Sequence, residues 1–400
     1  MRRAWRMQAA LLMALLLALS PDLVAACAAL FSPDGGVRQS AQRIIFAVDE
    51  SAQQVTAYVA VNYTGAAEDF AWIVPLPNNP QVEMVARDSF DALEFATTPR
   101  FLFPAENCLQ LDFGLTGSAP PPEAVGSAPG VNVFQQGQVG PYDFAVIGGT
   151  EGGQLADWLR QNRYRVTAEM EPLIQSYADM GMLFLAMKLQ GGQEASDIEP
   201  VALTFAATQA MVPLRLAAVG AEPGTELLVW VFAKSQVTPS NMQRLTISDD
   251  QIGVTSFFGG NNYRDLVDST LAEAAGRGLL TEVAIPSSDL GGVDDPLIAD
   301  LRERFPYLTR LYGRFDPAQM TIDPMFVPQA DLADIPVVHD LTDRVNPYDC
   351  GSRTVLPIAE QSAKDRSLAG LWIANRWLVP YLVAVVLLGI AIFWVAQRRR

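Results

Sequence analysis

The chain contains very little lysine, histidine or cysteine. Only three of its 28 basic residues are lysines, it has a single histidine, and it has three cysteines in 400 residues. Nucleic-acid binding needs clustered basic side chains, whereas this chain carries a formal net charge of −16. We therefore exclude nucleic acid as a partner and interpret the acidity as that of a solvated, non-aggregating surface.

The scarcity of histidine also restricts the possible chemistry. His339 is the only imidazole, so any Ser-His-Asp triad must use it, and no Gly-x-Ser-x-Gly turn is present. We expect His339 to be a structural residue in a loop after Pro336. Zinc needs more ligands than one histidine and three dispersed cysteines provide. The glycines at 148–153 are not followed by the Lys-Ser/Thr pair of a phosphate-binding loop, so we expect them to serve tight turns.

An uninterrupted apolar run lies near the carboxyl terminus, over residues 377–396. Twenty helical residues span about 30 Å, which matches the hydrocarbon core of a bilayer. Aromatic rings prefer the headgroup level, and terminal arginines favour the cytoplasmic side. The sequence predicts a transmembrane helix followed by a cytoplasmic tail at 397–400. The residues of this membrane anchor are Trp377, Tyr381, Trp394, Arg398, Arg399 and Arg400.

The amino terminus is typical of a secretory signal peptide. Arginines precede an apolar stretch at 9–19, and small residues follow at 24–26. The apolar stretch is too short to span a bilayer, so we assign residues 1–26 to a signal peptide, with an uncleaved signal-anchor helix as the alternative. The body from residue 27 to about 376 is then expected outside the cytoplasm, with a net charge of −21.

The three cysteines are disulfide candidates in such an oxidising compartment. Any two of Cys27, Cys108 and Cys350 can pair, and the sequence does not choose among the three pairings. A bridge from Cys108 to Cys350 would close a loop that the chain-entropy model values at up to roughly 5 kcal/mol. Cys27 directly follows the small residues, so lipidation of its thiol is an open alternative.

The pattern of the body predicts an α+β fold with antiparallel sheets and interspersed helices. Residues 27–350 form the expected domain, and a Pro/Gly-rich loop at 116–141 is expected to be an insertion rather than a boundary between two domains. Small polar residues at 351–376 suit a stalk. Strands are expected as a meander over 43–77 and again at 142–147, 182–189, 201–206, 212–219, 227–232 and 279–286, and helices at 89–97, near 155–159 and at 168–178, 263–275 and 296–305.

Carboxylates supply the remaining candidate sites. Asp289, Asp294 and Asp295 lie in a glycine-bearing acidic loop, which makes calcium the one cofactor that we consider, although the spacing fits no EF-hand. Two carboxylates would also suffice for a hydrolase, but nothing in the sequence selects the pair. The aromatic segment F-F-G-G-N-N-Y at 257–263 is a candidate contact surface.

Several segments together resemble the bacterial family catalogued as domain of unknown function 2330. The resemblance extends from residue 27 to about 340 and departs at Ala28 and Ala29, where the family favours glycine after the first cysteine. It implies an exported bacterial protein, commonly with a carboxyl-terminal membrane segment, and it implies no activity. The segments are C-A-A-L-F at 27–31, D-F-A-W-I-V-P-L-P at 69–77, and the stretches at 89–100, 141–147, 199–207, 213–220 and 308–326.

From the sequence we expect a single-pass protein of the bacterial cell envelope whose ectodomain binds or scaffolds another envelope component. The lipid bilayer is the partner of its carboxyl-terminal helix, and an exported carboxylate-dependent hydrolase is the alternative function. A concave pocket holding paired acids would favour the enzyme, whereas a surface with exposed aromatic residues would favour binding.

Protease treatment of intact spheroplasts should digest the body, because the predicted topology places it outside the cytoplasmic membrane. The measurement is the loss of the full-length band in an immunoblot. Survival of the body under these conditions, or recovery of the full-length chain in the soluble cytosolic fraction, would contradict the topology.

Overall fold

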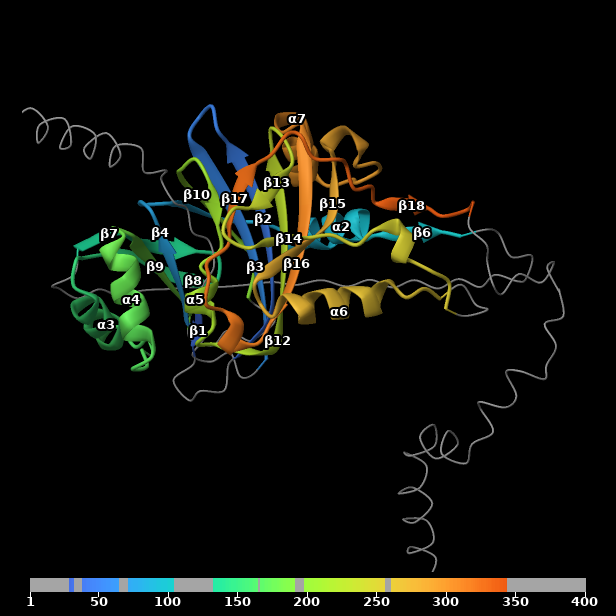
Figure 1. Ribbon diagram of the computed structural model, residues 1–400. Helices are drawn as coiled ribbons and strands as arrows, with labels where there is room; N and C mark the ends of the chain where they lie inside the picture. Colours follow the sequence, from blue (N-terminus) through green and yellow to red (C-terminus); the bar gives the residue numbers. More distant parts are fainter. Residues whose placement is uncertain are drawn as a thin grey trace, which may run out of the picture. The chain divides into compact units, whose positions relative to one another are not determined.

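Two large β-sheets dominate the protein (Figure 1). The computed structural model describes residues 29–31, 38–64, 71–103, 132–164, 166–190, 198–255 and 260–343. All of these residues belong to one of the two units into which the chain divides. The described part is strand-rich with a few helices, which confirms the α+β class.

The smaller of the two large sheets has five strands, and every neighbouring pair in it is antiparallel. Its two edges are β1 and β7. Strand β7 exposes every second residue, as expected for an edge strand with one covered face. In spatial order the strands are β1 (Ala29–Phe31), β4 (Ala71–Leu76), β9 (Leu183–Leu189), β8 (Tyr142–Gly148) and β7 (Asn132–Val139).

The larger sheet has eight strands and mixed pairing. Strand β12 runs parallel to β2, and β14 runs parallel to β15, so the expectation of purely antiparallel sheets was wrong for this sheet. The sequence separation of β2 and β12 leaves room for the crossover that parallel neighbours require. In spatial order the strands are β14 (Gln243–Leu245), β15 (Gly278–Pro286), β16 (Tyr307–Phe315), β12 (Ala221–Ala233), β2 (Arg38–Asp49), β3 (Gln54–Thr64), β10 (Val201–Ala206) and β5 (Gln81–Met84).

Two small sheets accompany the large ones. One joins β17 with β11 and β13 in antiparallel pairs, and the other pairs β6 with β18 in parallel. The second small sheet brings the residues after helix α2 beside residues some 240 positions later. The strands are β11 (Ala210–Met211), β17 (Met325–Pro328), β13 (Val237–Pro239), β6 (Arg100–Leu102) and β18 (Val338–Asp340).

The main hydrophobic core lies between the two large sheets. Val55 and Val59 of β3 face it, as the alternation of apolar residues in the sequence predicts. Val74 of β4 and Leu185 of β9 contribute from the five-stranded sheet to the same cluster of buried side chains. The two sheets therefore pack face to face, and each keeps an outer face that points away from the other sheet.

Helices cover part of both outer faces. On the five-stranded sheet, α3 and α4 bury Leu155 and Ile174 against Ile73 and Phe184. On the eight-stranded sheet, α2 and α7 pack around Trp230, and α6 lies along β15. The resulting order of layers is helix, sheet, sheet, helix. The helices are α2 (Arg87–Thr97), α3 (Gly152–Gln161), α4 (Met170–Asp179), α5 (Leu214–Ala217), α6 (Tyr263–Ala274) and α7 (Pro296–Arg304), with short 3₁₀ turns η2 (Asp249–Gln251), η3 (Ser287–Asp289) and η4 (Pro317–Gln319).

Three local expectations were wrong. The end of the loop expected at 116–141 is not a loop, because Asn132–Val139 forms strand β7 and pairs with β8. The strands expected over 43–77 do not form one meander, because β2 and β3 pair with each other while β4 joins the other sheet. The segment 212–219 is not a strand, because Leu214–Ala217 forms the short helix α5. Alternation of apolar residues indicates which face of a segment is buried, but it does not specify the partner strand.

Several sequence predictions concern residues that lie outside the described ranges. These are the signal peptide at 1–26, Cys27, Cys108 and Cys350, the stalk at 351–376, and the apolar run at 377–396. Within the described ranges, no helix combines the length and the apolar composition needed to cross a membrane. The predicted domain boundaries, disulfides and membrane anchor stay predictions.

Gly152 provides a test of the helical layer on the five-stranded sheet. A Cβ at this position would lie 2.7 Å from the Cα of Gln175 in α4, so only glycine permits the close approach of α3 and α4. The backbone N–H of Gly152 also donates a hydrogen bond of 2.7 Å to the side chain of Gln175. The close approach of the two helices, rather than a tight turn, explains why residue 152 is a glycine.

Gly152→Ala should lower the stability by roughly 1–3 kcal/mol, because the two helix backbones must separate. Gly153→Ala is the matched control: a Cβ there meets nothing within 4 Å, and alanine should stabilise the helix by about 0.5–1 kcal/mol. The measurement is thermal unfolding of the detergent-solubilised protein. Equal shifts for the two variants would contradict the packing of α3 on α4.

Candidate functional site

A polar groove lies on the outer face of the eight-stranded sheet, between α2 and α6. Its volume is about 710 Å³, which falls within the range of small-molecule and cofactor pockets. Strands β2, β12, β16 and β15 form the floor, and the two helices form the walls. The cationic side chains that line the groove are Arg43, Arg264, Arg310 and Arg314, and the acidic ones are Asp91, Glu94, Glu226, Asp268 and Glu282.

The floor obtains its polar side chains from the alternation of β16. Arg310, Tyr312 and Arg314 occupy every second position and line the groove, whereas Leu311 between them is buried in the core between the sheets. A β-bulge in the pairing of β15 with β16 falls at Glu282. Because a bulge inserts one residue and redirects its side chain, Glu282 joins the same polar surface.

Arg310 and Glu282 form a buried ion pair at the centre of the floor. The Nε of Arg310 donates to Oε2 of Glu282 at 2.9 Å, and the two side chains are only 8% and 7% exposed. The hydroxyl of Tyr263 in α6 donates to the other oxygen of Glu282 at 3.1 Å. The ion pair therefore connects the sheet with the α6 wall.

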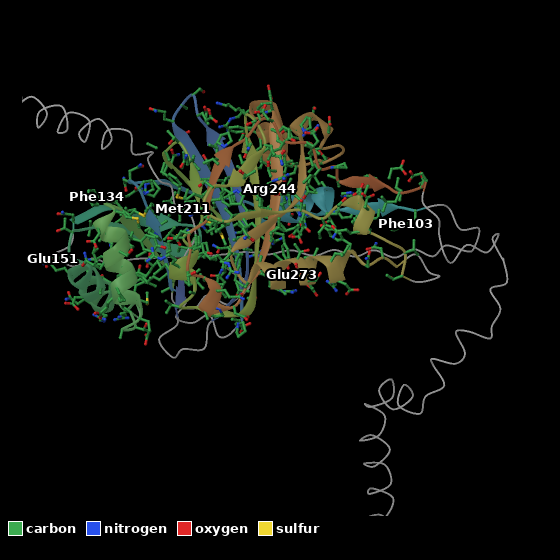
Figure 2. All side chains as sticks on the ribbon, viewed as in Figure 1. Phe103, Phe134, Glu151, Met211, Arg244 and Glu273 are labelled. Atoms are coloured by element: carbon green, nitrogen blue, oxygen red, sulfur yellow. The ribbon has the colours of Figure 1, made fainter. Side chains whose placement is uncertain are left out.

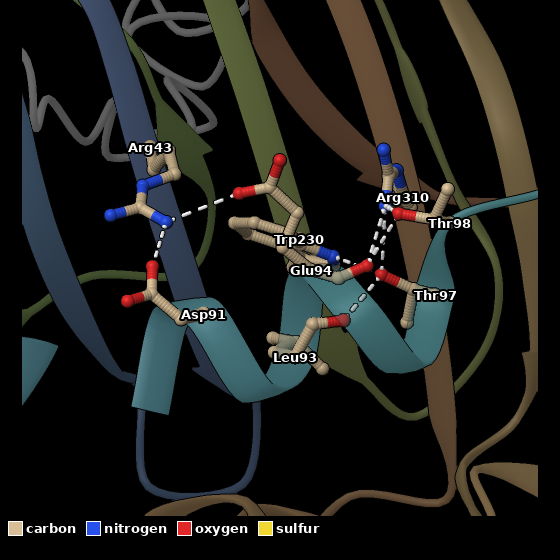
Figure 3. A network of polar contacts seen from close by, with 8 residues as sticks. All are labelled: Arg43, Asp91, Leu93, Glu94, Thr97, Thr98, Trp230 and Arg310. Atoms are coloured by element: carbon tan, nitrogen blue, oxygen red, sulfur yellow. Dashed lines mark hydrogen bonds and ion pairs between the residues drawn. The ribbon is translucent and has the colours of Figure 1, made fainter. Parts of the chain in front are cut away.

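The same arginine connects the sheet with the α2 wall (Figure 3). Its Nη1 lies 3.1 Å from the hydroxyl oxygen of Thr97 and 3.3 Å from the carbonyl oxygen of Glu94. Thr97 also accepts a hydrogen bond of 2.8 Å from the indole of Trp230. Helix α2 has no basic residue in its last turn, so Arg310 supplies the cation that the negative end of this helix favours.

The other arginines of the groove differ in their partners. Arg43 of β2 bridges Asp91 and Glu94 on α2 (Figure 3), and Arg314 pairs with Asp268 on α6 at 2.8 Å. Arg264 is exposed on α6 and forms no ion pair within the described residues. Each wall is thus joined to the floor by at least one ion pair.

Two tyrosines in the groove remain protonated at ordinary pH. Burial, followed by the nearby Glu282 carboxylate, raises the pKa of Tyr263. Burial and the hydrogen bond to Glu226 raise the pKa of Tyr312, whose hydroxyl donates to that carboxylate at 2.8 Å. Both phenols therefore act as hydrogen-bond donors to carboxylates, not as bases.

The exposed charge of the groove is mainly negative. Asp91, Glu94 and Asp268 are 58%, 42% and 48% exposed, whereas Arg43 and Arg310 are 13% and 8% exposed. Arg43 and Arg310 therefore lie below these acids, whereas Arg314 is 36% exposed and Arg264 is also exposed. Such an arrangement suits a polar ligand with basic groups, because the exposed part of each surface carboxylate can still contact a ligand.

Only two of the three candidate calcium ligands line the same hollow. Asp289 and Asp294 line a separate hollow of about 500 Å³. Asp295 caps helix α7, because its side chain accepts from the backbone of Ile298 at 2.9 Å and from the hydroxyl of Ser89 at 2.8 Å. Among the described residues no group of three or more Cys, His, Asp or Glu side chains could hold a metal ion. Calcium binding stays a prediction without a ligand cluster.

His339 lies in strand β18 and is buried, where a loop position had been expected. Its Nδ1 is 2.6 Å from Oδ1 of Asp249, and its ring stacks on Phe101 with centroids 5.0 Å apart. Its buried Nε2 has no hydrogen-bond partner in the described part of the chain, so no described serine is arranged for a triad. The structural interpretation of this histidine agrees with these contacts.

The groove elements all lie within a stretch that matches a known family. The model of the family DUF2330, described as an uncharacterized protein conserved in bacteria, matches residues 21–327. The chain belongs to this family. Comparisons with curated proteins and with solved structures gave no match. The function of this DUF2330 protein must therefore be argued from the chemistry of its surface.

Sequence reasoning did not identify the groove residues of this DUF2330 protein. Their signal was present in the segment L-T-R-L-Y-G-R at 308–314, where two arginines and a tyrosine alternate with other residues along a strand. An arginine in a central strand needs a buried partner. Of the aromatic contact segment at 257–263, Tyr263 lines the groove, while Phe257 and Phe258 lie outside the described residues.

Thr97 offers a test of the network in Figure 3. Thr97→Val preserves the shape but leaves the indole of Trp230 and one N–H of Arg310 without this acceptor, which should cost roughly 2 kcal/mol or more. Thr98→Val is the control, because Thr98 is exposed and 3.4 Å from Arg310; we expect less than about 1 kcal/mol. Thermal or urea unfolding measures both, and similar losses would contradict a central role for Thr97.

Proposed function

We propose that this DUF2330 protein is a single-pass, membrane-anchored ectodomain of the bacterial cell envelope that binds another envelope component in the α2–α6 groove. The observation that carries the proposal is the groove itself, which combines a rigid floor of strands with exposed carboxylates on both walls. A site built on strands and helices holds its side chains in fixed positions. The partner would present a polar segment with basic side chains.

The location rests on the sequence. The apolar run at 377–396 would anchor the chain, with Arg398–Arg400 on the cytoplasmic side, and the signal peptide at 1–26 would export the body. An exported body of this charge repels anionic lipid headgroups, which would keep the groove accessible to partners in the envelope.

The hydrolase alternative is less well supported by the groove. The two carboxylates on its floor strands are both engaged, the buried Glu282 by Arg310 and Tyr263, and the exposed Glu226 by Tyr312. A glycosidase-like acid pair needs one carboxyl group that is protonated at working pH and one that faces the reacting bond. Both oxygens of Glu282 are in contact with protein groups instead, one with Arg310 and the other with Tyr263. The hydrolase stays a prediction from the sequence.

Photo-crosslinking tests the binding proposal in intact cells. A photoreactive amino acid in place of Arg264, which is exposed on α6, should capture a defined partner. The same amino acid in place of Gln154, which is exposed on α3 in the opposite layer, should not capture it. Identical products from both positions, or no product from position 264, would overturn the assignment of the groove.

The charge of the groove can be tested with a matched pair of variants. Asp268 and Asp157 are both exposed and both pair with an arginine, at 2.8 Å and 3.0 Å. Asp268→Asn should lower the yield of the position-264 crosslink several-fold, because a basic partner loses an attractive charge. Asp157→Asn should leave the yield unchanged. An undiminished yield for Asp268→Asn would exclude a basic partner segment.

A further inference from the structure

A second hollow lies on the other side of the protein core, on the outer face of the five-stranded sheet. Its volume is about 360 Å³, and it forms where α3 ends and the edge strand β7 is left uncovered (Figure 2 labels Phe134 on this strand). It is independent of the groove described above. The polar side chains in its wall are Gln136, Gln138, Asp143, Asn162, Tyr164 and Lys188.

Three of these side chains form a row across neighbouring strands. Gln138 of β7 lies opposite Asp143 of β8, which lies opposite Lys188 of β9. Adjacent strands are about 4.8 Å apart, so an amide, a carboxylate and an ammonium group are presented within the span of one or two sugar rings. Lys188 is half-buried and forms no ion pair within the described residues.

An aromatic wall closes one side of the hollow. The rings of Trp158 and Tyr164 are stacked, with centroids 6.3 Å apart and planes 21° from parallel. The Nζ of Lys188 lies 5.8 Å from the centre of the Tyr164 ring. Burial raises the pKa of Tyr164, so its hydroxyl remains a hydrogen-bond donor.

We propose that this hollow binds a sugar ring that carries a carboxylate, as a uronic acid does. Amide groups both donate and accept hydrogen bonds, and so do sugar hydroxyls. The carboxylate of the ligand would pair with Lys188, which forms no ion pair within the described residues although Asp143 lies opposite it on β8. The apolar C–H face of the ring would pack against the small exposed part of the aromatic wall, since Trp158 and Tyr164 are 3% and 4% exposed.

Calorimetric titration of the detergent-solubilised full-length protein with glucuronate and with glucose tests the proposal. Glucuronate should bind more tightly than glucose. Lys188→Met keeps the aliphatic stem over Tyr164 but removes the charge, and it should weaken glucuronate binding by about tenfold or more. Lys234→Met is the control, because Lys234 is an exposed lysine that pairs with Glu50 far from the hollow; it should bind glucuronate like the unaltered protein.

Three results would overturn the proposal. They are the absence of saturable glucuronate binding at millimolar concentrations, an equal effect of the two lysine variants, and tighter binding of glutamate than of glucuronate. If Lys188→Met does not fold, Gln138→Ala replaces it, because Gln138 is exposed on an edge strand. That variant should weaken glucuronate and glucose binding together, and unchanged binding of both sugars would count against the site.

Discussion

The buried ion pair of Arg310 with Glu282 is the interaction on which the arrangement of the groove depends. It joins the neighbouring strands β15 and β16, and its members also hold Thr97 of one wall and Tyr263 of the other. A buried charge without its partner costs about 3–5 kcal/mol, far more than an exposed pair contributes. The network therefore leaves the walls only one low-energy position on the sheet, and this fixed position is what a binding groove requires.

Both hollows on the protein surface have a common physical origin. The two sheets bury their inner faces against each other, so that helices must cover the outer faces. The helices are too short to cover them completely. The groove forms between α2 and α6, and the second hollow forms beyond the end of α3 at the edge strand β7. At both places polar side chains replace apolar ones on the outer face of a strand.

Local features of this fold could be predicted from the sequence, whereas long-range pairing could not. Helices α4, α6 and α7 lie close to their predicted ranges, because apolar spacing is a local signal, to which α7 adds a cap at Asp295 and a proline in its first turn. The parallel neighbours β2 and β12 left no such signal, since about 180 residues separate them. The same limit explains the missed groove: the arginines at 308–314 indicate that a buried partner exists, but only the pairing of β15 with β16 identifies Glu282 as that partner.

The contacts of the arginines also explain why the sequence contains so little lysine. Of the 28 lysines and arginines, all but three are arginines. In the groove Arg43 holds two carboxylates, and Arg310 holds a carboxylate, a carbonyl and a hydroxyl. A planar guanidinium with five donors can bridge several acceptors in fixed directions, which a compact ammonium group cannot do. Structural positions in this acidic protein therefore favour arginine. Lys188 departs from this use, because it bridges no acceptors within the described residues, and a half-buried ammonium of that kind is suited to pair with an anion supplied by a ligand.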